Sequence, residues 1–346
     1  MKKITALLVL LLISSTTITY AGNTKEDDKQ GEITISKKYI PRINGTIRAK
    51  YEYQPEISAQ RFIVKNARLS ASGNVMEKIS YKIKVDLLNE GKFRMLDAYI
   101  KYNPLKDLYF TLGQMRVPFT IDAHRMPHIQ YFCNRSFLAK HAGNVRDVGF
   151  RGTYTLPDGA VKFDAGIFCG ADIQNQNDWH KGINYSGKIT FQPLGKWEIV
   201  TCVQKIQPGE VKIHIYDIGT HYTFRNLFLE TEYLYKRYKD HAFDDVHALN
   251  AIAKYDFHPK KLFDRISIVG RYDYMTDHSN GKNTDSLTGA LQLTHYGRER
   301  ATGGLTFSFR KYVEIRMNYE KYFYGKEAVP LKSEQDKVVI EGVLFF

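Results

Sequence analysis

The chain ends on Val338-Val339-Ile340-Glu341-Gly342-Val343-Leu344-Phe345-Phe346, and the alternation in this stretch decides the fold class. Every second residue from Val338 to Phe346 lies on one face of an extended chain, and the residues between them lie on the other. A period of two is typical of a β-strand whose two faces meet different surroundings. The stretch stops on an aromatic residue at the last position of the chain.

The same period of two recurs along most of the chain. It covers residues 43–53, 79–87, 148–156, 161–167, 183–191, 249–257, 266–274 and 313–319. Each run has about ten residues, the length that a tilted strand needs to cross a bilayer. Counting all strands gives sixteen, provided that residues 287–296 form a hairpin within a loop. We therefore predict an all-β protein, a transmembrane antiparallel β-barrel of sixteen strands.

The connections between these runs alternate in length. Tight turns are expected at residues 72–74, 103–106, 156–159, 192–195, 223–226, 258–260 and 310–312, where turn-forming residues gather. Longer connections fall between them, at residues 117–146, 171–182, 239–246, 276–300 and 325–335, with short exceptions near Gly91 and Gly209. Short periplasmic turns that alternate with longer extracellular loops are typical of outer-membrane barrels. A C-terminal aromatic that closes an alternating strand also resembles the signature read by the barrel assembly machinery, so Phe346 is the expected assembly signal.

The N-terminus predicts export from the cytoplasm. Lys2 and Lys3 precede an apolar run at residues 4–13, and small residues at Thr19 and Ala21 favour cleavage before Gly22. The apolar run is far shorter than the ~20 residues of a spanning helix. We expect a signal peptide at residues 1–21, a flexible lead-in at 22–39 and one barrel at 40–346, located in the outer membrane of a Gram-negative cell.

The charge balance and the cysteines exclude several classes of protein. The net charge is +13, or +11 without Lys2 and Lys3. Nucleic acid is excluded as a partner of an exported chain, so the positive charge indicates lipopolysaccharide phosphates or anionic solutes. Cys133, Cys169 and Cys202 have no metal-ligand spacing, and isolated thiols are expected. We predict no metal, no cofactor and no catalytic residue.

Four segments resemble the phosphate-selective porin O/P family. They are residues 61–69, 112–119 (LGQMRVPF), 146–150 and 303–307. The resemblance extends over most of the chain after residue 21 and implies a sixteen-stranded homotrimeric porin whose third extracellular loop folds into the lumen. The family's lumen arginines and lysine-rich binding site cannot be carried over residue by residue, so the resemblance does not imply phosphate specificity.

Strand parity identifies the side chains that are expected to face the lumen. The basic residues and the acids on this face nearly balance, so the wall alone does not predict ion selectivity; most of these charges are expected to pair across strands. The basic residues expected in the lumen are Arg48, Lys50, Lys82, Lys84, Lys101, Arg151, Lys188, Arg271 and Arg316.

The connection at residues 117–146 carries a stronger excess of positive charge. Its only acid is Asp122. It also contains three histidines that could become charged at mildly acidic pH, namely His124, His128 and His141. If it folds inward, it narrows the bore and sets the local field. The alternatives are pairing with lumen acids, packing at a trimer interface and contact with lipopolysaccharide. The residues expected at the constriction are Arg125, His128, Arg135, Lys140, His141 and Arg146.

These observations predict a porin for passive diffusion of small hydrophilic solutes, preferentially anions, with phosphate as one candidate. The expected partners are those solutes, outer-membrane lipid and lipopolysaccharide, the assembly machinery and two further copies of the chain. The alternatives are a non-conducting binding or adhesion barrel, an outer-membrane lipid hydrolase and a soluble periplasmic β-protein. Against the hydrolase, the sequence contains no GxSxG or HExxH motif.

Overall fold

The structure is a computed structural model that describes residues 40–89, 91–141, 143, 145–170, 173, 176, 179, 182–259, 262–310 and 312–346. The predicted signal peptide and lead-in, residues 1–39, lie outside the described residues. So does most of the predicted loop at residues 171–182.

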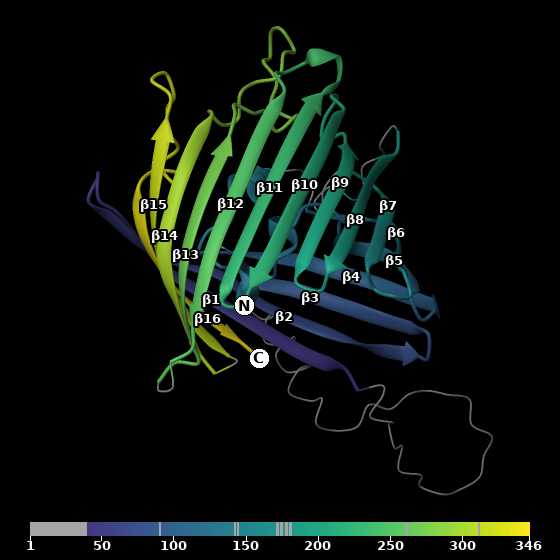
Figure 1. Cartoon of the computed structure of the whole chain (residues 1–346). Helices are drawn as coiled ribbons and strands as arrows, with labels where there is room; N and C mark the ends of the chain where they lie inside the picture. The colour runs from purple at the N-terminus through teal and green to yellow at the C-terminus, as the bar shows by residue number, and fades with distance from the viewer. Residues whose placement is uncertain are drawn as a thin grey trace, which may run out of the picture. The chain divides into compact units, whose positions relative to one another are not determined.

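Sixteen antiparallel strands form a closed barrel, which confirms the predicted fold class. Figure 1 shows the strands following one another around the sheet. They are β1 (Arg42–Gln54), β2 (Ala59–Met76), β3 (Ile79–Asn89), β4 (Lys92–Leu105), β5 (Leu108–Arg116), β6 (Arg146–Thr155), β7 (Val161–Phe168), β8 (Asn184–Leu194), β9 (Trp197–Ile206), β10 (Ile213–Phe224), β11 (Leu227–Tyr238), β12 (Val246–Phe257), β13 (Arg265–Met275), β14 (Arg298–Phe309), β15 (Val313–Tyr324) and β16 (Lys337–Phe345).

The two terminal strands close the barrel. β1 pairs with β16 in a continuous register from Thr46↔Phe345 to Tyr53↔Val338. The last residue extends this pairing, because Gly45 N donates to Phe346 O at 2.8 Å and Phe346 N donates to Gly45 O at 3.1 Å. Closure leaves no free strand edge, which is what a sheet in lipid requires.

Burial along the strands is reversed relative to a water-soluble protein. On β1, Arg48, Lys50 and Glu52 are buried, whereas Ile47 is 45% exposed. The outer face of the whole barrel carries exposed Ile, Leu, Phe and Tyr side chains, and the inner face carries charged ones. This arrangement puts apolar side chains toward lipid and charged ones toward the lumen. Within the described residues, no helix is long and apolar enough to cross a membrane.

The predicted turn at residues 72–74 is wrong. β2 continues through these residues to Met76, and the turn lies at residues 77–78. Gly73 pairs with Tyr81, and a Cβ at this glycine would lie 3.3 Å from the Tyr81 hydroxyl. The glycine therefore serves close packing against a tyrosine on the neighbouring strand, not chain reversal. Residues 287–296 lie in a loop, as predicted, and make only isolated bridges such as Thr284↔Leu291.

Gly113 offers a first test of the barrel wall. Its φ is +125°, and a Cβ there would lie 2.4 Å from the carbonyl oxygen of Ala98. We expect Gly113→Ala to lower the free energy of unfolding by about 1–3 kcal/mol, because both the backbone and the contact are strained. Urea-induced unfolding in lipid vesicles measures this change. Gly303→Ala is the matched control, since a Cβ at Gly303 meets nothing within 4 Å. Equal stability of the two variants would contradict the prediction.

Candidate functional site

The described part of the connection between β5 and β6, residues 117–141, 143 and 145, lies inside the barrel, and we call it the inward loop. It contains two short 3-10 helices, η3 (Asp122–His124) and η4 (Pro127–Ile129), and a one-turn helix α2 (Phe137–His141). Val117, Phe119, Phe137 and Leu138 are buried in one apolar cluster with inner residues of β9 to β13. Apolar packing therefore holds one side of the loop against the wall.

Hydrogen bonds from β1 and β15 fix the middle of the inward loop. The carbonyl of Cys133 accepts from Arg48 Nη2 at 3.0 Å and from Lys50 Nζ at 2.5 Å. Its N–H donates to Asn318 Oδ1 at 2.7 Å. These bonds satisfy a backbone that makes no strand or helix. The thiol of Cys133 is free, as are those of Cys169 and Cys202.

Three wall arginines hold further carbonyls of the loop. Arg271 Nη1 donates to Asn134 O at 2.9 Å, and Arg300 Nη2 donates to Arg135 O at 2.7 Å. Arg316 donates to the carbonyls of Pro127 and His128, at 3.1 and 3.2 Å. A guanidinium has five N–H donors, so it can hold the loop and a carboxylate at once.

The same arginines neutralise wall acids. Arg316 lies 2.5 Å from Glu314 and 3.1 Å from Glu341, and both Arg271 and Arg300 lie 2.8 Å from Asp273. Four residues predicted to line the lumen, Arg48, Lys50, Arg271 and Arg316, are therefore buried under the inward loop and do not face an open bore. Strand parity identified their inner face correctly, but it could not reveal what covers them.

Most of the predicted constriction residues also have partners. Arg125 lies 3.0 Å from Asp122 and 2.5 Å from Glu230. The other contacts follow the same pattern: Lys140 lies 3.1 Å from Glu334, Arg146 lies 2.8 Å from Asp97, and Arg135 donates to the carbonyls of Asp122 and Arg125. Arg125 and Arg146 are therefore paired with lumen acids, which was one of the alternatives to a role at the constriction.

The histidines of the inward loop do not behave as expected. Burial lowers the pKa of His124, and Lys188 and Arg116 lower it further. Burial and the nearby Lys84 and Arg316 likewise lower the pKa of His128, whose ring stacks on Phe345 at 4.9 Å. The pKa of His141 is also lowered, first by burial. The expectation that these groups charge at mildly acidic pH is therefore wrong, because their environment disfavours the charged imidazolium.

A second group of cations lies on the opposite part of the wall, and we call it the basic strip. It consists of the inner-face residues Lys82, Lys84, Lys101, Arg151 and Lys188 on strands β3 to β8. Lys82 and Lys84 make no hydrogen bond or ion pair with any residue that the structure describes. Asp97 faces Lys84 across the strands, but it is bonded to Arg146.

The rest of the strip is only partly balanced. Lys101 Nζ lies 3.6 Å from the centre of the Tyr109 ring, Arg151 lies 4.0 Å from Asp164, and Lys188 donates to Thr120 O at 2.8 Å. Arg151 and Lys188 also line a pocket of about 340 Å³, together with Lys162, Asp164 and Glu198. This pocket is polar and lies at the short-turn end, beneath Pro118 of the inward loop.

Asp122 organises the turn of the inward loop and gives a second test. It accepts from Ser136 N at 3.1 Å and from Ser136 Oγ at 2.7 Å. Burial alone would raise the pKa of Asp122, but Arg125 and Arg135 lower it to about 2. A depressed folded pKa means that the carboxylate stabilises the fold fully above about pH 4 and loses this effect only as the pH falls through about 2.

We therefore expect the Asp122 carboxylate to stay charged and to add no current noise between pH 7 and pH 4. Asp122→Asn should add current noise at every pH, because the amide removes the negative charge from Arg125 and Arg135. Loss of a buried charged hydrogen bond costs about 1–3 kcal/mol locally. Single-channel recording measures the noise, and Asp158→Asn, in an exposed turn, is the control. A quiet Asp122→Asn channel would contradict the role given to this carboxylate.

Comparisons with known proteins agree with the barrel fold. The sixteen-stranded fold is that of the outer membrane protein OmpT of Vibrio cholerae, solved in a trimer form, at TM-score 0.63 and 11% identity, with 89% of this chain and 99% of that chain covered. The DcaP channel of Acinetobacter baumannii gives TM-score 0.61 and 14% identity over 88% of this chain and 97% of that one. The anion-selective porin from Comamonas acidovorans gives TM-score 0.61 and 10% identity over 89% and 99%. No curated protein matches the sequence.

The closed barrel has the fold of outer-membrane porins, and part of the sequence is similar to a porin family. Residues 43–196 match the model of the phosphate-selective porin O and P family. This match confirms, over those residues, the resemblance seen in the sequence.

Proposed function

We propose that the protein is a channel, not an enzyme, that lets small hydrophilic anions diffuse passively across the outer membrane, with phosphate among the candidate solutes. The observation that carries the anion preference is the basic strip. Lys82 and Lys84 are inner-face cations without a bonded acid among the described residues, whereas acids such as Asp273 and Glu341 on the other part of the wall are bonded to arginines.

The inward loop creates this asymmetry. It covers inner residues of β1 and of β9 to β16, where Glu230, Asp273 and Glu341 are paired with arginines. The space left for solute then adjoins the strands that carry the basic strip. A narrow pore has a lower effective dielectric constant than bulk water, so unbalanced charges there act strongly on an ion.

The same proposal includes the assembly and location of the porin. After removal of a signal peptide near Ala21, the chain enters the outer membrane, and Phe346 serves as its assembly signal. The long loops face the lipopolysaccharide, and three copies of the chain form a homotrimer. The trimer form of the similar Vibrio cholerae protein supports the homotrimer by analogy. The anion selectivity named for the Comamonas acidovorans porin supports the proposed preference for anions in the same way.

Reversal potentials across a planar bilayer test the function. Purified protein with a potassium chloride gradient should give discrete conductance steps and a reversal potential of the sign expected for chloride permeation. Adding phosphate on one side should then reduce the chloride current if phosphate enters the same path. Absence of channels, or a reversal potential of the cation sign, would overturn the proposal.

A further inference from the structure

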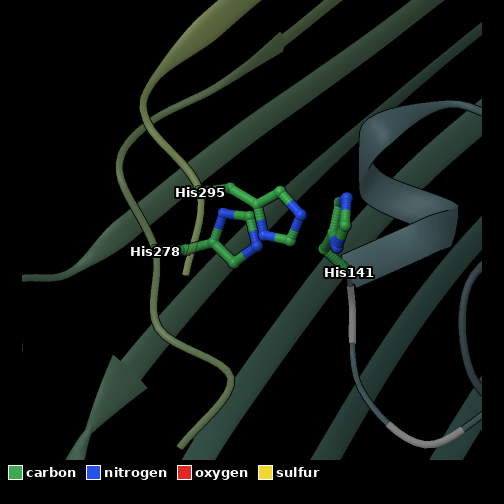
Figure 2. Close-up of side chains that lie close together, drawn as sticks. All are labelled: His141, His278 and His295. Carbon is green, nitrogen blue, oxygen red and sulfur yellow. The ribbon is translucent and has the colours of Figure 1, made fainter. Parts of the chain in front are cut away.

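Three histidines that are far apart in the sequence meet at the long-loop end of the barrel. His141 ends helix α2 of the inward loop, and His278 and His295 lie in the loop between β13 and β14. Figure 2 shows the His278 and His295 rings side by side, with the His141 ring facing them from the helix. One nitrogen of each ring lies within 4.8 Å of the others.

The backbone holds two of these rings in place. His278 and His295 form an isolated antiparallel bridge, in which His278 N donates to His295 O at 3.1 Å. Their rings are nearly parallel, with centres 4.8 Å apart, and the His141 ring centre lies 4.7 Å from His278 and 4.4 Å from His295. The backbone bridge therefore presents both rings to the third ring.

Two buried nitrogens of this group lack a partner. His278 is 2% exposed, and the Nδ1 atoms of His278 and His295 are buried with no hydrogen bond to any described residue. A buried polar atom without a partner is unfavourable, and an ordered water or a bound ion in the adjoining space would satisfy it. A cavity of about 170 Å³, which Asn280 and Thr294 also line, adjoins the three rings.

We propose that His141, His278 and His295 bind a divalent late transition metal ion, with Zn²⁺ as the representative, and thereby tie the inward loop to the loop between β13 and β14. Three imidazoles with an open fourth position are a known zinc ligand set. Zinc–nitrogen bonds of about 2.0–2.1 Å require ligand nitrogens about 3.3 Å apart, so side-chain shifts of about 1 Å would complete the site.

The protonation of the rings suits this role. Burial is the main reason that the pKa values of His141, His278 and His295 are all lowered, and this favours the neutral imidazole form that a metal binds.

The charges around the rings select the kind of metal and the fourth ligand. Lys140 and Arg298 face the site, but both are bonded to Glu334, at 3.1 and 2.7 Å. Lys236 and Lys282 also line the cavity, and Lys236 Nζ donates to Ser279 O at 2.9 Å. This positive setting disfavours ions that are held mainly by charge, such as Mg²⁺ and Ca²⁺, and favours ions with strong bonds to nitrogen. It also favours an anion, such as chloride or hydroxide, as the fourth ligand.

Metal binding would require Arg298 to give up its contact with His141. Its Nη2 lies 3.1 Å from His141 Nε2, whereas its Nε lies 2.7 Å from Glu334. Metal binding through His141 Nε2 replaces the first contact and leaves the second. Glu334 itself lies 4.0 Å from His141 Nε2, close enough to hold the displaced guanidinium beside the site.

Zinc titration of the untagged full chain, folded in detergent, tests the site. Calorimetry with zinc chloride should give one tight site per chain, and magnesium chloride should give none. His278→Ala and His141→Ala should each weaken zinc binding by about 100-fold or more, because loss of a ligand exceeds the 10–100-fold effect of losing an outer partner. His247→Ala, an exposed histidine on the outer face of β12, is the matched control and should bind as the parent does.

Thermal unfolding supplies a second readout. Zinc should raise the unfolding temperature of the parent and of His247→Ala, but not that of His278→Ala, because a ligand that binds only the folded chain stabilises it. Heat-modifiable mobility of each variant on gels verifies that its barrel has folded. Zinc binding that is equal in the parent and in the folded His141→Ala and His278→Ala variants would overturn the proposal, and so would no binding to the parent.

Discussion

Reversing the charge of Lys82 and Lys84 together should abolish or invert the anion preference of the channel. At an effective dielectric constant of about 20, a unit charge about 8 Å from a permeating ion acts on it with about 2 kcal/mol. About 1.4 kcal/mol changes a ratio tenfold. We therefore expect Lys82→Glu/Lys84→Glu to lower the ratio of chloride to potassium permeability by at least about tenfold, measured from reversal potentials.

Conservative substitutions separate charge from shape. Lys82→Arg/Lys84→Arg keeps both positive charges and should keep the selectivity of the parent. The effect of the glutamates should also shrink in about 1 M salt, where the Debye length falls to about 3 Å. Unchanged selectivity in the glutamate variant would mean that the charges deciding selectivity lie outside the basic strip, although single-channel conductance could still establish a porin.

Removing the Arg316 side chain should release the middle of the inward loop. Arg316 is fully buried, bonds Glu314 and Glu341, and donates to the carbonyls of Pro127 and His128. Removing one partner from a buried ion pair costs about 3–5 kcal/mol. We expect Arg316→Ala to lower the free energy of unfolding by about 3 kcal/mol, because Arg48 and Arg265 still bond the two acids. The channel should also become noisier and more conductive.

Two further variants show whether the loss of stability and the added current noise are specific to Arg316. Arg316→Lys keeps the charge but lacks the planar fork, so its stability and noise should lie between those of the parent and of Arg316→Ala. Arg237→Ala removes an exposed arginine and should change neither property. Urea unfolding in vesicles and bilayer recording measure the two effects. A quiet Arg316→Ala channel of normal conductance would show that Arg316 does not hold the loop.

Alternation along the chain was enough to predict the barrel. A strand in a membrane barrel faces lipid on one side and water on the other. Apolar and polar residues therefore alternate along the strands of such a barrel, and Val338–Phe346 shows this period of two. Parity also gave the inner face of Arg48, Lys84 and Arg316 correctly. The rule that turn-forming residues mark chain reversals failed at Gly73, which lies within β2 and packs closely against Tyr81.

The path of the inward loop determines which of the lumen charges are paired, and the sequence did not predict this path. A charge count could show that residues 117–146 are basic, but not that Arg125 meets Glu230, more than a hundred positions away. Such pairs depend on which distant strands face each other across the lumen, and this is a property of the closed barrel.

The sequence by itself determined the sixteen-stranded barrel, the face of each strand and the positions of the long loops, because these follow from local periodicity and turn chemistry. Only the tertiary structure decided which lumen charges are balanced, which cations remain in the basic strip, and that His141, His278 and His295 meet. The physical reason is range: a local pattern is set by neighbours along the chain, whereas pairing of charges and ligands is set by neighbours in space.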